Sequence, residues 1–337
     1  MAIYLGIDGG GTKTSCVVAD EATVLGTAIS GGSNITRHGD ARVREALHAA
    51  VRDACTAAKI DPSHIVSSCV GLSGAGRPEV REAVTRMLRE VLSGKIEVVT
   101  DLETTLAAAF SDGPGVIVIA GTGSIAYGRD AHGRTARAGG WGLAISDEGS
   151  GQWIGRAAVS AVLGATDAGE NPALLAEILG LWKLTTLDEL VRHANASPAP
   201  DFSSLVPLLL AAAEKPRPSG AWTGNPAAGV GNELGQIGGT TDETDHSPGA
   251  QGDLLALGVL QRAGHELASL ARSVIRRLFG AGVDVPLAMA GGVFRQSGIV
   301  RQVFYNGVIA AVPQAMVQAE IVDAVNGALA LARKASR

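Results

Sequence analysis

Apolar and polar residues follow two alternating patterns along the chain. Short apolar runs rich in β-branched side chains are typical of buried strands. Longer segments carry apolar residues at helical spacing, as Val43, Leu47 and Val51 do within Asp40–Ala58, and these segments predict amphipathic helices. The predicted strands are Ala2–Ile7, Thr14–Ala19, Val24–Ile29, Ile65–Leu72, Lys95–Thr100, Gly115–Ala120, Ile125–Gly128 and Val285–Ala290.

Predicted helices occupy most of the intervals between these strands, and this alternation indicates the α/β class. Helices dominate as far as Ala213, after which Lys215–Gly252 is rich in Gly, Pro, Asn, Thr and Ser and is predicted to be a long mobile loop. The predicted helices are Asp40–Ala58, Glu79–Leu92, Glu103–Phe110, Gln152–Leu163, Leu254–Phe279 and Ala319–Ala335.

Two strand–turn–strand units, Ile3–Ala19 and Val116–Arg129, share one design. Each consists of an apolar strand, a turn that contains Gly and Thr, and an outgoing strand. We interpret the pair as a weak internal repeat, in which two similar halves place two glycine turns on opposite sides of one cleft. The length of 337 residues agrees with about two domains.

Composition and charge narrow the class of protein. Hydrophobic residues make up 46% of the chain and charged residues 18%, so a large core can form, and the net charge of −5 without a basic run disfavours a nucleic-acid partner. Apolar runs such as Leu205–Ala213 are too short to span a membrane, and the N-terminus lacks the basic start of a signal peptide. Three separated cysteines argue against a disulfide framework or a cysteine-rich metal site. We expect a soluble cytoplasmic protein.

The turn within Asp8–Thr14 carries the strongest chemical signal. Three consecutive glycines leave backbone N–H groups uncovered, and such groups line anion sites. Thr12 adds a hydroxyl, Lys13 adds a cation, and Asp8 at the mouth suits Mg²⁺ held through water. This pattern favours a phosphate site over a plain hairpin turn. It is not a Walker A loop, because a predicted strand rather than a helix follows it.

Two further glycine turns follow predicted strands. Gly121–Ser124 opens a G-x-G-x-x-A pattern typical of dinucleotide binding, but a strand is predicted to follow, so we interpret it as a second phosphate turn. Gly291–Arg295 suggests a third turn, for the nucleoside or phosphates, with a plain turn at a strand end as the alternative.

Three polar segments are weaker candidates. Asp101 ends a strand, and it is either a helix N-cap or a catalytic carboxylate. Asp147 and Glu148 precede a helix and follow the sequence Gly-Gly-Trp-Gly, which suits ligand binding as well as capping. Asn34 offers a donor and an acceptor that match two sugar hydroxyls, although its segment also fits a plain loop.

The complete set of motifs resembles one known family. The motifs occur in order over nearly the whole chain, and they resemble the N-acetylglucosamine kinase branch of the BadF/BadG/BcrA/BcrD-type ATPases, within the actin/hexokinase/Hsp70 superfamily. They are DGGGTKT (Asp8–Thr14), SN (Ser33–Asn34), GLSGAG (Gly71–Gly76), TD (Thr100–Asp101), AGTGS (Ala120–Ser124), GGWG (Gly139–Gly142), DEGSG (Asp147–Gly151) and AGGVF (Ala290–Phe294).

This resemblance implies two RNase H-like, actin-like ATPase domains with a cleft between them. Residues 1–112 with 318–337 would form one domain, and residues 113–317, with the flexible segment 215–252, the other. It also implies a homodimer that uses ATP and Mg²⁺ to phosphorylate the 6-hydroxyl of N-acetylglucosamine.

The resemblance also implies a role for each motif residue. Asp101 would be the general base, and Asp8 would hold Mg²⁺ through water. Nucleotide contacts would fall on Gly10, Gly11, Thr12, Lys13, Thr122, Gly123, Gly291, Gly292 and Arg295. Sugar contacts would fall on Asn34, Ser73, Gly74, Asp101, Ser124, Gly140, Trp141, Gly142, Asp147 and Glu148.

Two alternatives stay open at this point. A glucosamine or N-acetylmuramate kinase would share the fold, and a free amine would require an extra carboxylate such as Glu148 or Glu103. A non-catalytic sugar or nucleotide sensor, or an ATPase that activates a partner, belongs to a different class. The presence of Asp8, Asp101 and Asp147 favours catalysis, because a sensor does not need a base.

Overall fold

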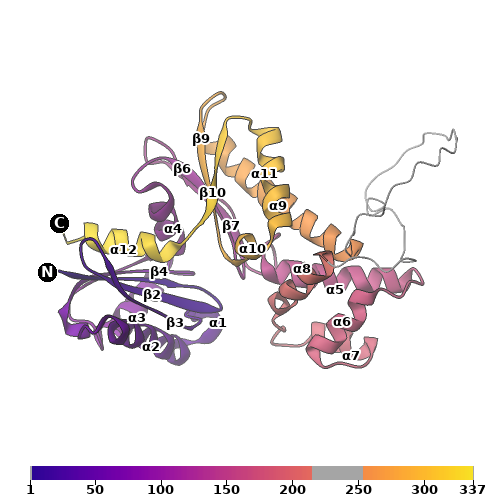
Figure 1. Cartoon of the computed structure of the whole chain (residues 1–337), viewed down its shortest axis with the longest axis horizontal. Helices are drawn as coiled ribbons and strands as arrows, with labels where there is room; N and C mark the ends of the chain where they lie inside the picture. The colour runs from indigo at the N-terminus through magenta and orange to yellow at the C-terminus, as the bar shows by residue number, and fades with distance from the viewer. Residues whose placement is uncertain (1, 215–252, 337) are drawn as a thin grey trace.

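The computed structural model describes residues 2–214 and 253–336 and contains two α/β halves (Figure 1). The sheet of the first half has the strand order β3-β2-β1-β4-β5. In it, β1 pairs antiparallel with β2 and parallel with β4. The five strands are β1 (Ile3–Gly9), β2 (Lys13–Ala19), β3 (Val24–Gly31), β4 (Ile65–Leu72) and β5 (Lys95–Thr100).

The second sheet repeats this plan in the order β10-β9-β6-β7-β8. Its central strand β6 pairs antiparallel with β7 and parallel with β9, as β1 does with β2 and β4. The internal repeat inferred from two hairpins therefore extends over both sheets. The five strands are β6 (Gly115–Ala120), β7 (Ser124–Arg129), β8 (Thr135–Gly139), β9 (Val285–Ala290) and β10 (Ala315–Val322).

Helices cover both faces of the first sheet, and one of them comes from the C-terminal end of the described chain. That helix, α12 (Ala324–Lys334), packs on β1, β4 and α4 (Asp101–Phe110) (Figure 1). Gly327 of α12 lies so close to the backbone of Thr104 that a Cβ there would overlap its carbonyl oxygen. The other helices of this half are α1 (Ile35–His38), α2 (Asp40–Ala58), η1 (Pro62–His64) and α3 (Pro78–Arg89).

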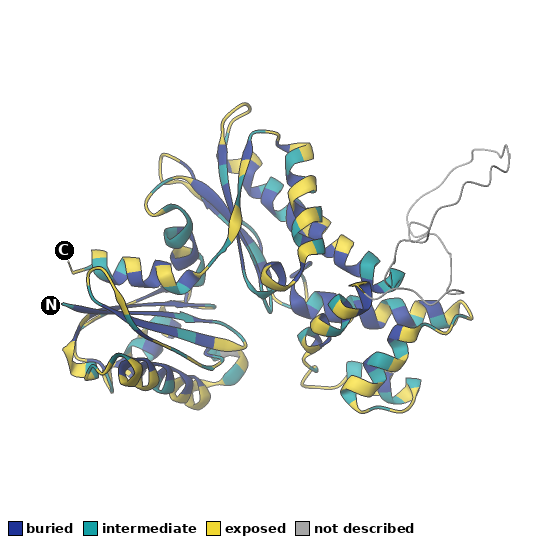
Figure 2. Cartoon of the chain, in the orientation of Figure 1, coloured by how far each residue is buried: buried dark blue, intermediate teal, exposed yellow. Residues whose placement is uncertain are grey.

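The second half carries a larger helical layer, and its core lies between that layer and the sheet (Figure 2). Val116 and Val118 of β6 pack in one apolar cluster with residues of the long helix α9, such as Leu267 and Ala271. The helices of this half are α5 (Gly151–Asp167), α6 (Ala173–Trp182), α7 (Leu187–Ala194), η2 (Phe202–Leu205), α8 (Val206–Glu214), α9 (Leu254–Leu278), α10 (Gly292–Gln296) and α11 (Gly298–Ala311).

The sequence prediction is wrong at the C-terminal helix. Ala315–Val322 forms strand β10, and α12 begins only at Ala324, so the predicted helix Ala319–Ala335 starts too early. Ala and Glu favour helix locally, but parallel pairing with β9 stabilises the strand. Strand β8 and helix α11 were also not predicted. The predicted mobile loop lies outside the described residues.

We propose that the two sheets mark two domains. Strand β10 belongs to the second sheet through Val322, while α12 packs on the first. A boundary at residue 323 rather than 318 would therefore keep β10 whole.

Within residues 2–214 and 253–336, no helix combines the length and the apolar character that a membrane crossing requires.

Candidate active site

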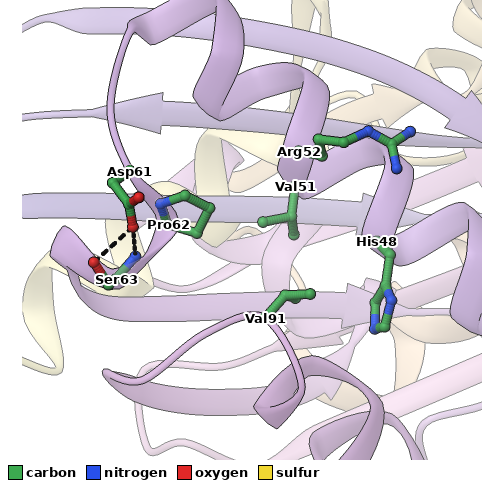
Figure 3. A pocket seen from close by; sticks show the side chains of 7 residues that line it. All are labelled: His48, Val51, Arg52, Asp61, Pro62, Ser63 and Val91. Atoms are coloured by element: carbon green, nitrogen blue, oxygen red, sulfur yellow. Dashed lines mark hydrogen bonds between the residues drawn. The ribbon is translucent and has the colours of Figure 1, made fainter.

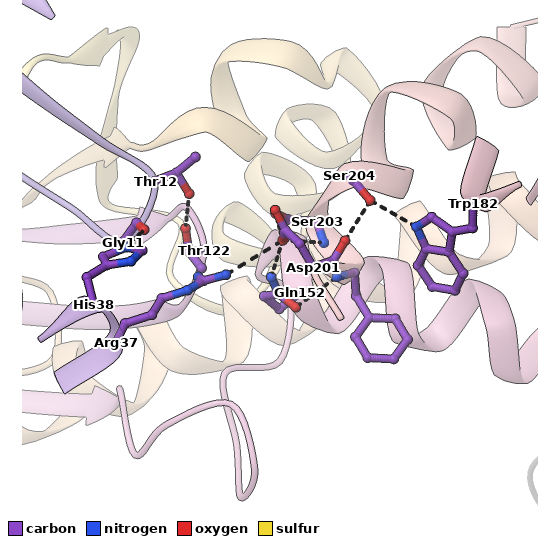
Figure 4. A network of polar contacts seen from close by, with 11 residues as sticks. Gly11, Thr12, Arg37, His38, Thr122, Gln152, Trp182, Asp201, Ser203 and Ser204 are labelled. Atoms are coloured by element: carbon purple, nitrogen blue, oxygen red, sulfur yellow. Dashed lines mark hydrogen bonds and ion pairs between the residues drawn. The ribbon is translucent and has the colours of Figure 1, made fainter. Parts of the chain in front are cut away.

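The two glycine turns meet in the structure. Residues 10–12 join β1 to β2, and residues 121–123 join β6 to β7. The N–H of Gly10 donates to the carbonyl of Lys13, and the hydroxyl oxygens of Thr12 and Thr122 lie 2.9 Å apart (Figure 4). The fold thus brings together two turns that lie far apart in the sequence and that we predicted to face each other.

Asp8 lies at the end of β1, next to the first turn. Burial raises the pKa of its carboxyl to about 7, and the carboxylates of Asp101 and Asp323 act in the same direction. The charges of Lys13 and Arg295 partly offset this effect on the pKa. Side chains from both halves therefore converge on Asp8, and a cation there would relieve the repulsion among the carboxylates.

The donor set around Asp8 fits one type of metal site. The described residues contain no group of three or more His, Cys, Asp or Glu side chains that could hold a metal ion. Mg²⁺ usually binds through one or two carboxylates and takes its remaining ligands from water and phosphates. Asp8 therefore fits an open magnesium site but not a closed protein cage.

Asp101 is the first residue of α4, and its carboxylate is not the N-cap. Thr100 is the N-cap and forms a capping box with Glu103. Burial raises the pKa of Asp101 to about 6, while the N–H groups of Leu102 and of Asp101 itself and the Ser73 hydroxyl lower it. A carboxylate with this pKa is largely ionised at neutral pH, yet more basic than an exposed aspartate.

Asn34 and Ser73 connect the first turn to Asp101. The side-chain amide of Asn34 donates to the Ser73 hydroxyl at 3.4 Å, and that hydroxyl hydrogen-bonds to Asp101. The N–H of Ser73 donates to the carbonyl of Gly9 at the end of β1, and Gly74 follows with a φ of 90°. Four predicted site residues therefore lie in one contiguous group.

Asp147 contributes a second carboxylate from the other half. Its side chain is buried, and its Oδ1 has no hydrogen-bond partner among the described residues. Burial raises its pKa, Glu148 adds to this effect, and the N–H groups of Gly142 and Ser124 oppose it. Its Oδ2 lies 2.7 Å from the position that a Cβ on Gly123 would occupy. A ligand hydroxyl would supply the donor that this carboxylate lacks.

The loop before Asp147 carries Trp141 at the surface. Trp141 is 63% exposed, and the guanidinium of Arg137 lies 4.0 Å from the centroid of its ring. Gly140 and Gly142 have positive φ angles, which glycine tolerates and other residues rarely adopt. The hydroxyl of Ser124 donates to the carbonyl of Glu148 at 2.6 Å and so attaches this loop to β7.

The third glycine motif begins a helix rather than a plain turn. Gly291, with a φ of 98°, is the N-cap of α10, and Gly292 is its first residue. Arg295 of this helix donates to the carbonyl of Val322 and lies 3.7 Å from the Asp323 carboxylate. Arg295 therefore lies where the chain crosses to α12, within electrostatic reach of Asp8.

The comparison with protein families decides the membership of the chain. The model of the BadF/BadG/BcrA/BcrD ATPase family matches residues 5–195. The chain belongs to this family. This confirms the resemblance that the motifs indicated.

The chain is similar to the N-acetylmuramic acid/N-acetylglucosamine kinase of Clostridium acetobutylicum, with 30% identity over 99% of each chain. The N-acetyl-D-glucosamine kinase of Dictyostelium discoideum is 28% identical, over 98% of this chain and 97% of that one. A solved structure titled as a putative N-acetylglucosamine kinase from Chromobacterium violaceum has a TM-score of 0.68 at 24% identity, covering 98% of this chain and 99% of that one. The structural match shows the two-domain actin-like fold.

In this member of the BadF/BadG/BcrA/BcrD family, sequence reasoning missed three charged residues near the site. Asp323 lies near Asp8, but it follows the strand β10 that was not predicted. Arg37 and Asp201 form an ion pair at 3.9 Å (Figure 4). No local pattern marks these residues, because their proximity depends on how the two halves pack.

Two surface hollows lie apart from this group of residues. One, of about 390 Å³, lies beside α2 and η1 (Figure 3), and the other, of about 350 Å³, lies between α5 and α9. No predicted site residue lines either hollow. The first is lined by His48, Val51, Arg52, Asp61, Pro62, Ser63 and Val91, and the second by Trp153, Arg156, Ala157, Ser160, Ala161 and Arg262.

Proposed function

We propose that the chain is an ATP-dependent amino-sugar kinase that transfers the γ-phosphoryl group of ATP to the 6-hydroxyl of N-acetylglucosamine. One observation carries this proposal. The Asp101 carboxylate, whose pKa is about 6, is linked through Ser73 to the end of β1, next to the place where the two glycine turns meet. The names of the two relatives support the substrate class. The resemblance also leads us to propose a cytoplasmic homodimer.

The phosphates of ATP would bind between the two turns. The backbone N–H groups, the hydroxyls of Thr12 and Thr122 and the cation of Lys13 would hold the negatively charged oxygens. Because the two hydroxyl oxygens lie 2.9 Å apart, the turns would have to separate to admit a triphosphate. Closure around bound substrates would exclude water from the reaction. When bound, Mg²⁺ supplies charge neutralisation at the phosphates, and Asp8 would hold it through water.

The sugar would lie between Asn34 and Ser73 on one side and Asp147 on the other. Asp147 would accept a hydrogen bond from a sugar hydroxyl at its unpartnered Oδ1. Asp101 would accept the proton of the 6-hydroxyl while that oxygen forms a bond to the γ-phosphorus and the bond to the ADP oxygen breaks. The products would be ADP and a sugar phosphate.

A coupled ADP-release assay with a panel of sugars tests this proposal. We expect rapid ADP release with N-acetylglucosamine and slower release with glucosamine, N-acetylmuramate and glucose, and the phosphorus spectrum of the product would show a phosphate on carbon 6. A preference for glucosamine or N-acetylmuramate would favour an alternative substrate. ADP release that no sugar accelerates would exclude a sugar kinase.

Activity should decline in mild acid, because protonation removes the base. With the pKa of Asp101 at about 6 and that of Asp8 at about 7, both carboxyls of the free enzyme gain protons as the pH falls from 8 to 5. We expect the rate to fall across this interval when it is measured with sugar and MgATP both far below saturation, where it reports on the free enzyme. A profile that stays flat down to pH 5 would contradict the assigned base.

Substituting Gly123 by Ala should weaken sugar binding. The new Cβ would approach Oδ2 of Asp147 to 2.7 Å and displace the carboxylate, because real Cβ contacts are longer. We expect KM for the sugar to rise by about tenfold or more, the effect of losing one charge-assisted hydrogen bond. Gly164→Ala is the control, since open space surrounds that position on α5. Unchanged KM in Gly123→Ala would remove Asp147 from the sugar site.

A further inference from the structure

The side chain of Arg37 extends from α1 to the place where the two turns meet (Figure 4). Its Nη1 lies 3.4 Å from the position that a Cβ on Gly11 would take, and the hydroxyl of Thr122 lies 3.4 Å from the same position. The neighbouring ring of His38 contacts the carbonyl of Gly11 at 2.7 Å, which holds α1 against the first turn. A guanidinium in this place is adjacent to both predicted phosphate turns.

The partner of Arg37 in the structure is a weak one. Nη2 of Arg37 lies 3.9 Å from Oδ1 of Asp201, and the two side chains are 33% and 47% exposed. Solvent-exposed ion pairs of this kind contribute little to stability, so Arg37 can exchange this partner for a stronger anion. Asp201 would keep other partners, because its carboxylate also accepts from the N–H of Ser203 and the side-chain amide of Gln152.

The segment that carries Arg37 is also linked to the base through Ser73. Asn34 lies at the start of the same segment and donates to Ser73, whose hydroxyl hydrogen-bonds to Asp101. Residues 34–38 therefore contact Ser73, the partner of the base, through one end and the first phosphate turn through the other. In a direct transfer, the phosphoryl group moves between the leaving diphosphate and the hydroxyl beside the base. The guanidinium of Arg37 lies beside the turns that would hold the phosphates, at the end of the segment opposite to Asn34.

We propose that Arg37 binds the terminal phosphoryl group of a nucleoside triphosphate. Its ion pair with Asp201 breaks when the triphosphate binds. This inference rests on the proposed function, and it adds a residue outside every motif that the sequence carries. A guanidinium presents paired donors that match phosphate oxygens, and its fixed charge stabilises the phosphoryl oxygens during transfer. Asp201 competes for the same guanidinium, so the two residues have opposite effects on triphosphate binding.

Nucleotide titration calorimetry on the full chain, with Mg²⁺ and without sugar, tests this inference. The ligands are ADP and a non-hydrolysable ATP analogue, and the proteins are wild type, Arg37→Ala, Arg37→Lys and Asp201→Asn. We expect Arg37→Ala to weaken the analogue about tenfold and ADP less than about twofold, because only the analogue carries the terminal phosphoryl group. Arg37→Lys should fall between wild type and Arg37→Ala.

The Asp201 variant separates this role from a merely structural one. Asparagine can still cap η2, and we expect Asp201→Asn to bind the analogue at least as tightly as wild type. If the ion pair only fastens the two halves together, Arg37→Ala and Asp201→Asn will shift both nucleotides in the same direction, and the inference is overturned. Arg42→Ala is the charge control, because Arg42 is exposed on the next helix.

The nucleotide titrations contain no sugar, so their result does not depend on which sugar the enzyme phosphorylates. If wild type binds the analogue but phosphorylates no amino sugar, the proposed function fails while the role of Arg37 is still decided by the two nucleotides. Equal weakening of ADP and the analogue in Arg37→Ala would overturn the inference in an active kinase as well. Thermal unfolding of each variant identifies any loss of fold. If Arg37→Ala does not fold, the comparison of Arg37→Lys with wild type decides the inference.

Discussion

Substituting Asp101 by Asn is expected to lower kcat by about 10²–10⁴ while leaving the binding of ATP and sugar nearly unchanged. The amide has almost the shape of the carboxylate and can still accept from the Ser73 hydroxyl, so the local structure is retained. It cannot accept the proton of the sugar hydroxyl. Steady-state kinetics measure kcat, and calorimetry with each substrate measures binding separately.

The matched control for this variant is Glu97→Gln. Glu97 lies exposed on β5, the strand that leads to Asp101, so its substitution removes the same charge from the preceding element. We expect the control to retain full turnover. Near-complete activity in Asp101→Asn would exclude Asp101 as the base, and equal losses in the two variants would point to an effect of net charge.

Substituting Asp8 by Asn is expected to stabilise the protein and to inactivate it. The folded-state pKa of Asp8, about 7, lies above the ordinary aspartate pKa of 3.8, so the folded state holds this proton more tightly than the unfolded state. The contribution of Asp8 to stability is therefore largest at low pH and is lost as the pH rises through 7. At pH 8 the ionised carboxylate destabilises the fold, and we expect Asp8→Asn to raise the free energy of unfolding by about 1–3 kcal/mol.

The activity of Asp8→Asn should fall by two orders of magnitude or more, on the order expected for removing a group that positions the phosphate-bound metal. Chemical unfolding at pH 5 and pH 8 measures the stability, and ADP release at varied Mg²⁺ measures the activity. Asp20→Asn is the control of opposite sign, because backbone N–H groups of Thr23 and Ala22 lower the pKa of Asp20. A destabilised or fully active Asp8→Asn would contradict the role given to Asp8.

These two expectations connect stability with function. Asp8, Asp101 and Asp147 all have raised pKa values, and burial is the largest cause at each. Carboxylates in such surroundings cost folding stability, and proteins keep them where activity requires them. The unpartnered Oδ1 of Asp147 belongs to the same pattern.

Local sequence was sufficient to predict the hairpins and their turns. The apolar strands on each side of the turns at Gly10 and Gly121 pair as expected, because strand pairing across a short turn depends on neighbouring residues. The position of Asp101 after β5 was predicted for the same reason. Its helix N-cap was assigned less well, since Thr100 and Asp101 are both favourable caps and only the side-chain geometry distinguishes them.

Features that depend on distant contacts could not be predicted. Strand β10 has the composition of a helix, and only its pairing with β9 makes it a strand, so Asp323 at its end was missed as a neighbour of Asp8. Arg37 and Asp201 lie in segments without any motif, and their contact joins the two halves. Sequence patterns describe neighbours along the chain, whereas these residues meet through the packing of whole domains.

A crystal structure with a non-hydrolysable ATP analogue and N-acetylglucosamine tests the central claim most directly. The account predicts that the triphosphate lies between Thr12 and Thr122, and that a carboxylate oxygen of Asp101 lies within about 2.6–3.2 Å of the oxygen on carbon 6 of the sugar. A triphosphate bound away from both turns, or a sugar whose hydroxyls all lie beyond the reach of Asp101, would contradict it.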